Sequence, residues 1–155
     1  MSWRDQTLGI HLLNFFYNKL KNNCFFCEKQ FLLKIFVVDM NTNESKSADD
    51  IAKFSELYTE AIDKNEPNSL GWGFYNSNEK IILIERYLNA EAMMEHAKNI
   101  SEGGKLEANF GKFMEHFTIN KIDVYGTASE ELKEFVKPFG LPFYFHPDLA
   151  KFSRN

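Results

Sequence analysis

The chain has 155 residues, a hydrophobic fraction of 44% and a formal net charge of −4 at pH 7. This length suits a single domain, and the acidic balance argues against nucleic acid as the main partner, because phosphate binding needs a basic face. No apolar run reaches the roughly 18 residues that a membrane span needs. The 16 phenylalanines provide enough apolar area for a large core or an apolar pocket. We therefore expect a cytoplasmic protein without a membrane span.

Residues 1–30 differ in pattern from the residues that follow. In TLGIHLLNFFYNKLKNN, apolar residues recur at helical spacing, which predicts an amphipathic helix that packs on its own domain or on a neighbour. Polar residues interrupt the apolar run and no small-residue cleavage site follows, so a secretory signal is not expected. Cys24 and Cys27 form the pair CFFC, which in other contexts is redox-active or half of a zinc site. No second pair follows, so we interpret them as reduced thiols and predict no metal site.

The next elements read as strand, helix and hairpin. Residues 31–40 (FLLKIFVVDM) and 80–88 (KIILIERYL) are apolar at odd and even positions alike, which predicts strands covered on both faces. Between them, Ser47 and Asp50 predict the start of a capped helix with an apolar stripe. Residues 69–76 (SLGWGFYN) predict a second strand, and NSNE is a turn that returns the chain into the third.

A second helical region completes the core pattern. A helix is predicted from Ala90, another over about 104–116, and a strand over 117–126 (FTINKIDVYG). The order β-α-β-β-α-β across residues 31–126 is the ferredoxin-like arrangement of an α+β fold.

The sheet of such a fold is covered by helices on only one face. In the predicted third strand, however, Ile82 and Ile84 point to one face and Ile81 and Leu83 to the other. Something must bury the second apolar face, and a second copy of the same sheet is the simplest solution. We therefore predict a homodimer through the sheet face.

The chain continues with a smaller extension. Thr127 and Glu130 predict a capping box, the following helix ends near Gly140, and a short strand is predicted at about 142–146. The predicted organisation is an N-terminal helical extension (1–30), a ferredoxin-like domain (31–126) and a C-terminal helix-plus-strand extension of the same domain (127–155).

The motif ERYLNAEAMMEH after a hairpin, followed by a helix and IDVYG, resembles the antibiotic-biosynthesis-monooxygenase-like family of dimeric α+β barrels. That family typically has a Glu-x-aromatic pair at the end of the third strand and a His on the following helix. Here those positions are Glu85, Tyr87 and His96. The resemblance covers residues 31–126, extends more loosely over 127–155 through VYG-x-x-S-x-E-L and LAKFSR, and does not include residues 1–30.

The resemblance implies a pocket between the sheet and the helices, no metal, no organic cofactor, and quinol-like or phenolic substrates that dioxygen oxidises directly. Haem-degrading relatives use an Asn, a Trp and a His. Another residue occupies the expected Trp position near His96, so one of the three residues that a haem-degrading enzyme would need is not at its expected position.

His96 is the first candidate catalytic residue. It lies on the apolar stripe between Met93 and Ile100, so it should face the sheet. One interpretation is a core histidine bonded to a backbone carbonyl or to Glu85. The other is a general base, because imidazole exchanges protons near neutral pH.

Glu85 and Tyr87 share one strand face by the period of two. A carboxylate on so apolar a strand needs a partner, and we predict that it is His96, whose tautomer Glu85 would then fix. The alternative is a solvated strand end. Tyr87 would donate a hydrogen bond to a substrate carbonyl or pack against the helix.

Trp72, Phe74 and Met93 are the candidate substrate-binding residues. Gly71 and Gly73 leave the opposite strand face bare, and such positions often mark the close approach of a ligand or another backbone. Core or dimer packing is the alternative for Trp72. The sequence as a whole predicts a cofactor-independent monooxygenase acting on a small quinol or phenolic compound. The alternative is a non-catalytic dimer that binds a small apolar ligand or fills its pocket with its own phenylalanines.

Overall fold

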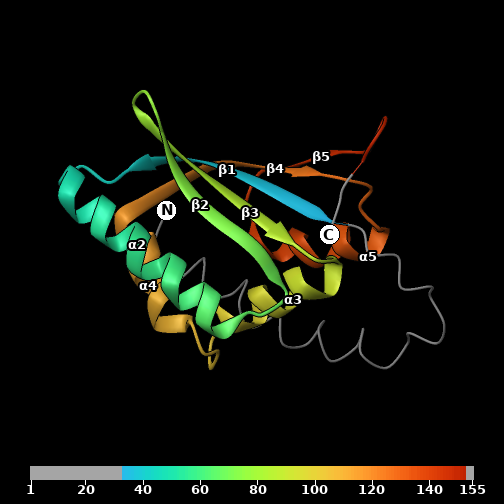
Figure 1. The fold of residues 1–155 in the computed structure, drawn as a ribbon, viewed down its shortest axis with the longest axis horizontal. Helices are drawn as coiled ribbons and strands as arrows, with labels where there is room; N and C mark the ends of the chain where they lie inside the picture. The colour runs from blue at the N-terminus through green and yellow to red at the C-terminus, as the bar shows by residue number, and fades with distance from the viewer. Residues whose placement is uncertain (1–32, 153–155) are drawn as a thin grey trace.

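The computed structural model describes residues 33–152 (Figure 1). The predicted N-terminal helix and the pair Cys24 and Cys27 lie outside these residues. The elements in chain order are β1 (Lys34–Thr42), α2 (Ala48–Asn65), β2 (Ser69–Ser77), β3 (Lys80–Tyr87), α3 (Ala90–Asn99), α4 (Glu107–His116), β4 (Phe117–Tyr125), α5 (Glu130–Val136), the 3₁₀ helix η1 (Lys137–Phe139) and β5 (Phe143–His146).

The five strands form one mixed sheet in the order β2-β3-β1-β4-β5. The three pairs among β1 to β4 are antiparallel, and β5 joins β4 in parallel. The order and directions of the first four strands are compatible with the predicted ferredoxin-like arrangement. The C-terminal strand extends the same sheet by one position.

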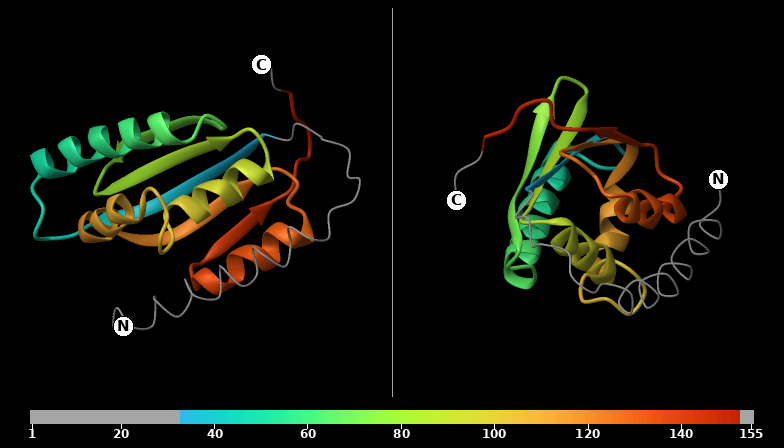
Figure 2. Two further views of the ribbon diagram at one scale, coloured as in Figure 1. Left: turned by 90° about the horizontal axis from the view of Figure 1, so that it is seen from below. Right: turned by 90° about the vertical axis from the view of Figure 1, so that its right-hand side faces the viewer.

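The helices cover one face of the sheet and leave the other open (Figure 2). Side chains along β3 alternate accordingly: Ile81 and Leu83 are buried under the helices, whereas Ile82 and Ile84 are half-buried on the open face. This confirms that the strand is apolar on both faces. Within the described part of the chain, no helix has the length and apolar character needed to cross a lipid bilayer.

Helix α2 begins where the sequence predicts. Ser47 Oγ accepts a hydrogen bond from the Asp50 backbone N–H at 3.2 Å, and Asp50 Oδ2 accepts one from the Ser47 N–H at 3.0 Å, which completes a capping box. The buried side chains of the helix are Ile51, Phe54, Tyr58 and Ile62. The helix ends at Glu66, whose N–H donates to the Ile62 carbonyl at 2.8 Å. This ending places the Glu66 side chain between the two layers.

The predicted cap of α5 is wrong by two residues. Ser129, not Thr127, accepts from the Leu132 N–H at 3.2 Å. Thr127 instead donates its backbone N–H to Asp148 Oδ2 at 3.1 Å. Thr127 is therefore engaged by a hydrogen bond with the C-terminal segment, and the helix begins after Ser129.

Candidate functional site

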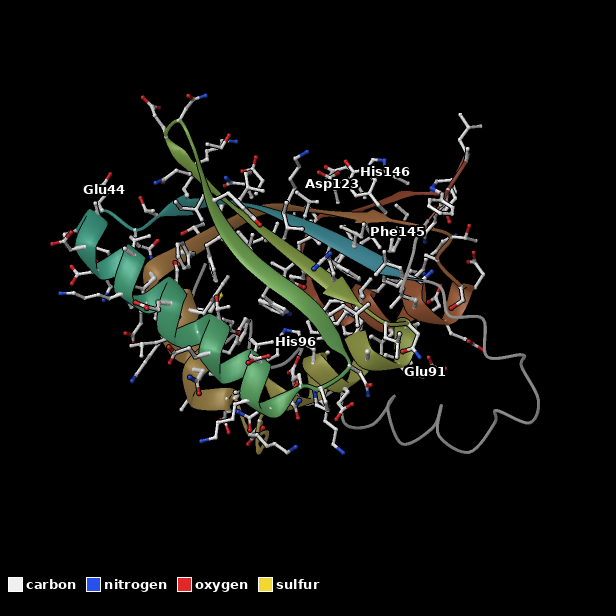
Figure 3. The ribbon with its side chains drawn as sticks, in the orientation of Figure 1. Glu44, Glu91, His96, Asp123, Phe145 and His146 are labelled. Carbon is white, nitrogen blue, oxygen red and sulfur yellow. The ribbon has the colours of Figure 1, made fainter. Side chains whose placement is uncertain are left out.

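Helix α3 carries His96 to the covered face of the sheet. Asn89 Oδ1 caps the helix by accepting from the Ala92 N–H at 2.9 Å, which sets the turn so that Met93, His96 and Ala97 are buried. His96 is 7% exposed. Figure 3 shows it below the strands, on the side of the helices. This orientation confirms that His96 faces the sheet.

The partner of His96 is Glu66 and not Glu85, contrary to the prediction. His96 Nδ1 lies 3.0 and 3.1 Å from the two carboxylate oxygens of Glu66. The same carboxylate accepts from Asn99 Nδ2 at 3.0 Å and from Ser69 Oγ at 2.9 Å. Glu66 is 3% exposed and Asn99 is 5% exposed. The carboxylate is therefore buried with three hydrogen-bond donors around it.

These donors decide the ionisation of Glu66. Burial by itself raises the pKa of Glu66, but the hydrogen bond and charge of His96, together with Asn99 and Ser69, lower the pKa below its ordinary value. Glu66 is thus an anion at neutral pH, and an anionic carboxylate can only accept. His96 Nδ1 must therefore carry a proton, so that in the neutral form of the ring Nε2 holds the free lone pair.

Glu85 and Tyr87 do share a face of β3, as predicted. The Tyr87 hydroxyl donates to Glu85 Oε2 at 2.8 Å. Burial raises the pKa of Glu85, and the charge of His96 and the Tyr87 hydrogen bond offset this only in part. Burial also raises the pKa of Tyr87 well above its ordinary value, so its hydroxyl remains protonated.

The pKa values of these two carboxyl groups are consequently shifted in opposite directions. Glu66 is held as the anion, Glu85 is shifted toward the neutral acid, and His96 is electrostatically coupled to both. When the surroundings of two titratable groups push their pKa values apart in this way, one site can supply both an acid and a base. The arrangement places an imidazole near a carboxyl group whose raised pKa favours its neutral form.

A cavity of about 80 Å³ lies beside these groups. Its lining is mainly apolar and includes Phe36, Phe113, Met93, Trp72, Glu85 and His96. Tyr87 and Phe74 do not line it: Tyr87 is fully buried and bonded to Glu85, and Phe74 stacks on Phe117 at 5.6 Å. Of the predicted substrate-binding residues, the structure thus brings Trp72 and Met93 to the cavity and places Phe74 in packing.

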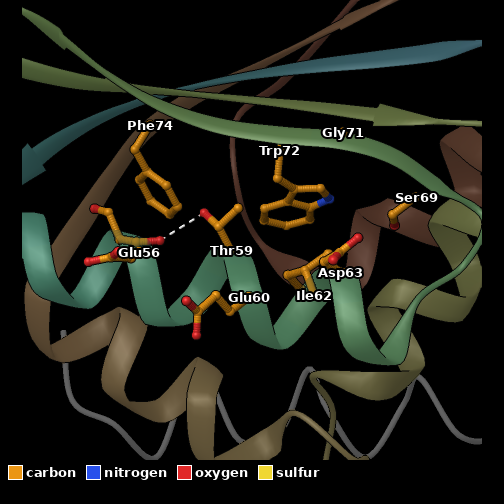
Figure 4. Close-up of a pocket in the computed structure, with 10 residues that line it drawn as sticks. Glu56, Thr59, Glu60, Ile62, Asp63, Ser69, Gly71, Trp72 and Phe74 are labelled. Atoms are coloured by element: carbon orange, nitrogen blue, oxygen red, sulfur yellow. Dashed lines mark hydrogen bonds between the residues drawn. The ribbon is translucent and has the colours of Figure 1, made fainter.

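A larger, open groove of about 540 Å³ lies between α2 and β2 (Figure 4). We call it the α2–β2 groove; its lining residues include Glu56, Thr59, Glu60, Asp63, Trp72 and Phe74. The Thr59 hydroxyl on its α2 wall donates to the Ser55 carbonyl at 2.8 Å. Trp72 hangs from β2 toward α2, and its ring centroid lies 4.8 Å from that of His96.

Sequence reasoning missed Glu66, Asn99 and Ser69. Asn99 could have been found, because it follows His96 by three positions on one helix and so shares its face. Glu66 lies in the polar run KNEPN at a helix end, which has the composition of an exposed turn. In residues 33–152, no group of three or more His, Cys, Asp and Glu side chains is placed to hold a metal ion.

The fold and site together define an α+β protein with a buried histidine–carboxylate pair beside an apolar cavity. No family model matches the chain, and no curated protein sequence matches it. A similar solved structure is that of MupZ from Pseudomonas fluorescens, with a TM-score of 0.62 and 22% sequence identity over 79% of this chain and 94% of that chain. At this identity, the likeness shows a shared fold alone.

Proposed function

We propose that the chain is an acid–base enzyme that oxidises a small quinol or phenolic compound with dioxygen, with His96 as the general base. The observation that carries the proposal is the buried Glu66–His96 pair at 3.0 Å, which engages Nδ1 of a histidine that lines the cavity. A base of this kind typically contributes about 10²–10⁴-fold to a rate. The family resemblance suggests that neither a metal nor an organic cofactor takes part.

The reaction balances with dioxygen as the oxidant. His96 Nε2 removes a proton from a ring hydroxyl or an activated CH₂, and the electron-rich anion passes one electron to dioxygen. The resulting radical pair combines to form a C–O bond in a hydroperoxide. Loss of the remaining C–H proton and cleavage of the O–O bond then give a C=O group and water. One oxygen atom enters the product, and the other leaves as water.

Three groups have supporting roles in this scheme. Glu66 orients the imidazole and stabilises it once protonated. Glu85, with its raised pKa, can return a proton to the leaving oxygen. The apolar walls, among them Phe36 and Phe113, keep water from the reactive intermediate.

We further propose that two copies pair through the open face of the sheet. Ile35, Val37, Ile82 and Ile84 are half-buried there in the single chain. Tyr125, next to Ile35 in the sheet, is 45% exposed. These apolar side chains share the open face with Asp39 and Asp123, which pair with Lys80 and Lys121. Apolar side chains that the helices leave uncovered on a sheet face typically mark a protein interface.

The alternative is a non-catalytic protein with the same fold. The observation that favours it is the size of the cavity, since about 80 Å³ is below the roughly 150 Å³ cavity that has held a benzene ring. In that case Glu66 and His96 would form a satisfied polar cluster that specifies the packing of α3 on α2.

Dioxygen uptake by the purified, full-length chain tests the two functions. The substrates are a panel of hydroquinones and anthrone-like phenols, and the variants are His96→Gln and, as a control histidine outside the site, His116→Gln. We expect saturable uptake that falls about 10²–10⁴-fold in His96→Gln and not in His116→Gln. Equal uptake by all three proteins, with all three folded, would favour the non-catalytic alternative.

A further inference from the structure

Trp72 lies between the α2–β2 groove and the His96 cavity. Among the residues that line the two spaces, it is the one common to both. Its ring lies 4.8 Å from the ring of His96 and 5.9 Å from that of Tyr58 on the cavity side. On the other side it forms a wall of the open groove (Figure 4). A ligand that reaches His96 from this groove must therefore pass the indole.

The indole N–H is the one polar side-chain atom in the described residues that is buried without a hydrogen-bond partner. An unpaired buried donor destabilises the folded state, so native structures rarely retain one without a use. An oxygen atom of a ligand would supply the missing acceptor. His96 Nε2 and the Trp72 N–H would then act on the same bound ring from adjacent positions.

The strand that carries Trp72 lies at one edge of the sheet. β2 is an edge strand that pairs with β3 alone, and its register breaks between Ser69 and Gly71, directly before Trp72. The α2–β2 groove provides space into which the indole can turn. With the indole turned, the groove and the cavity would form one space within the about 300–1,000 Å³ that is usual for small-molecule sites.

The opening of the groove is acidic. Glu56, Glu60 and Asp63 of α2 line it, whereas Lys53 and Lys64 of the same helix do not. A surface of one charge sign repels ligands of that sign and lowers their rate of association. The groove therefore disfavours negatively charged ligands. These include carboxylates, phosphates, and thioesters of cofactors that carry phosphate groups.

We infer that Trp72 is the specificity-determining residue of the cavity: an uncharged aromatic ligand enters through the α2–β2 groove, displaces the indole and accepts a hydrogen bond from its Nε1. This inference rests on the proposed function for the identity of the ligand as a phenol or quinol. The binding it describes does not require turnover.

Fluorine NMR on the full-length chain tests the inference with three probes: para-fluorophenol, para-fluorotoluene and para-fluorobenzoate. In Trp72→Phe, which keeps an aromatic wall and loses the N–H, we expect para-fluorophenol to bind about 3–10-fold more weakly and para-fluorotoluene to bind as before. In Trp72→Ala, the exchange of para-fluorophenol should become faster. Tyr75→Phe, on the opposite face of β2, is the matched control and should change neither probe.

The charge of the probe gives an independent readout. At low salt, para-fluorobenzoate should bind at least about tenfold more weakly than para-fluorophenol, and the triple change Glu56→Gln, Glu60→Gln and Asp63→Asn should narrow this gap. Equal weakening of both neutral probes in Trp72→Phe would overturn the inference, as would failure of the unmodified chain to bind para-fluorophenol. If the probes bind as expected while His96→Gln leaves dioxygen uptake unchanged, the oxidation proposal fails and the binding inference stands.

Discussion

The two faces of the sheet each carry a histidine paired with a carboxylate, in very different surroundings (Figure 3). Below the sheet, the side chains of His96 and Glu66 are 8% and 3% exposed. Above it, His146 Nε2 lies 2.9 Å from Asp123 Oδ1, and those side chains are 44% and 11% exposed. Asp123 also pairs with Lys121 at 2.7 Å, whereas the donors to Glu66 besides His96 are the neutral side chains of Asn99 and Ser69.

The difference shows that surroundings, more than residue types, decide what such a pair can do. Asp123 is bound first by Lys121 and then by His146, whose side chains are 46% and 44% exposed, so the outer pair behaves as a surface interaction. Glu66 depends on His96 and two neutral donors, and His96 lines an apolar cavity. We expect substitutions in the inner pair to have large effects and the same substitutions in the outer pair to have small ones.

The largest effect is expected on folding stability. Glu66→Ala should lower the free energy of unfolding by about 3–5 kcal/mol, because His96, Asn99 and Ser69 lose a buried acceptor together. Asp123→Ala should cost no more than about 1 kcal/mol, because its partners are solvated. Urea denaturation followed by circular dichroism measures both. Similar losses in the two variants would contradict the distinction between the faces.

A smaller effect is expected on activity from a substitution that keeps the shape of the inner pair. Glu66→Gln should reduce dioxygen uptake about 10–100-fold, because a neutral amide can still orient the imidazole but no longer stabilises it when protonated. Asp123→Asn is the matched control and should leave uptake unchanged. Uptake in Glu66→Gln equal to that of the unmodified chain would remove Glu66 from the mechanism.

The open face provides a third comparison. Ile84→Lys should convert a dimer to a monomer in light scattering coupled to size-exclusion chromatography, because a charge replaces an apolar side chain in the proposed interface. Leu57→Lys, on the exposed side of α2, is the control and should not change the mass. A monomeric unmodified chain at high concentration would refute the proposed pairing.

The smallest expected effect concerns the pH dependence of stability. Because the pKa of Glu66 is lowered on folding, its contribution to stability is present above its unfolded pKa and is lost as the pH falls through the folded value. The raised pKa of Glu85 acts in the opposite sense, so its contribution is lost as the pH rises through the folded value. Glu85→Gln mimics the neutral acid and does not titrate. Its free energy of unfolding, relative to that of the unmodified chain, should therefore increase as the pH rises from acid to neutral. A constant difference between the two proteins across that range would show that Glu85 is not shifted.

The sequence was sufficient for most elements of the fold because each had a local cause. The two-sided apolar strands and the Ser47 capping box lie where expected, and the strand limits differ from the prediction by at most three residues. The predicted α5 cap is wrong because Asp148, 21 positions away from Thr127, accepts a hydrogen bond from the Thr127 N–H, and Ser129 caps the helix instead.

The candidate site depended more on distant contacts. The orientation of His96 follows from helical periodicity, and the Tyr87–Glu85 contact follows from the period of a strand. The partner of His96 lies 30 positions earlier, across the α2–β2 turn, and no local pattern links the two residues. The burial of the unpaired Trp72 indole N–H likewise follows only from the packing of the strand on the helix.

The tautomer of His96 tests the central claim most directly, and long-range ¹H–¹⁵N NMR of the imidazole nitrogens reports it. At neutral to mildly alkaline pH, we expect His96 Nδ1 to be protonated and Nε2 to be unprotonated, because the Glu66 carboxylate can only accept. Glu66→Ala should remove this preference. A ring protonated at Nε2, or a tautomer unchanged by Glu66→Ala, would contradict the assignment of His96 as a base held by Glu66.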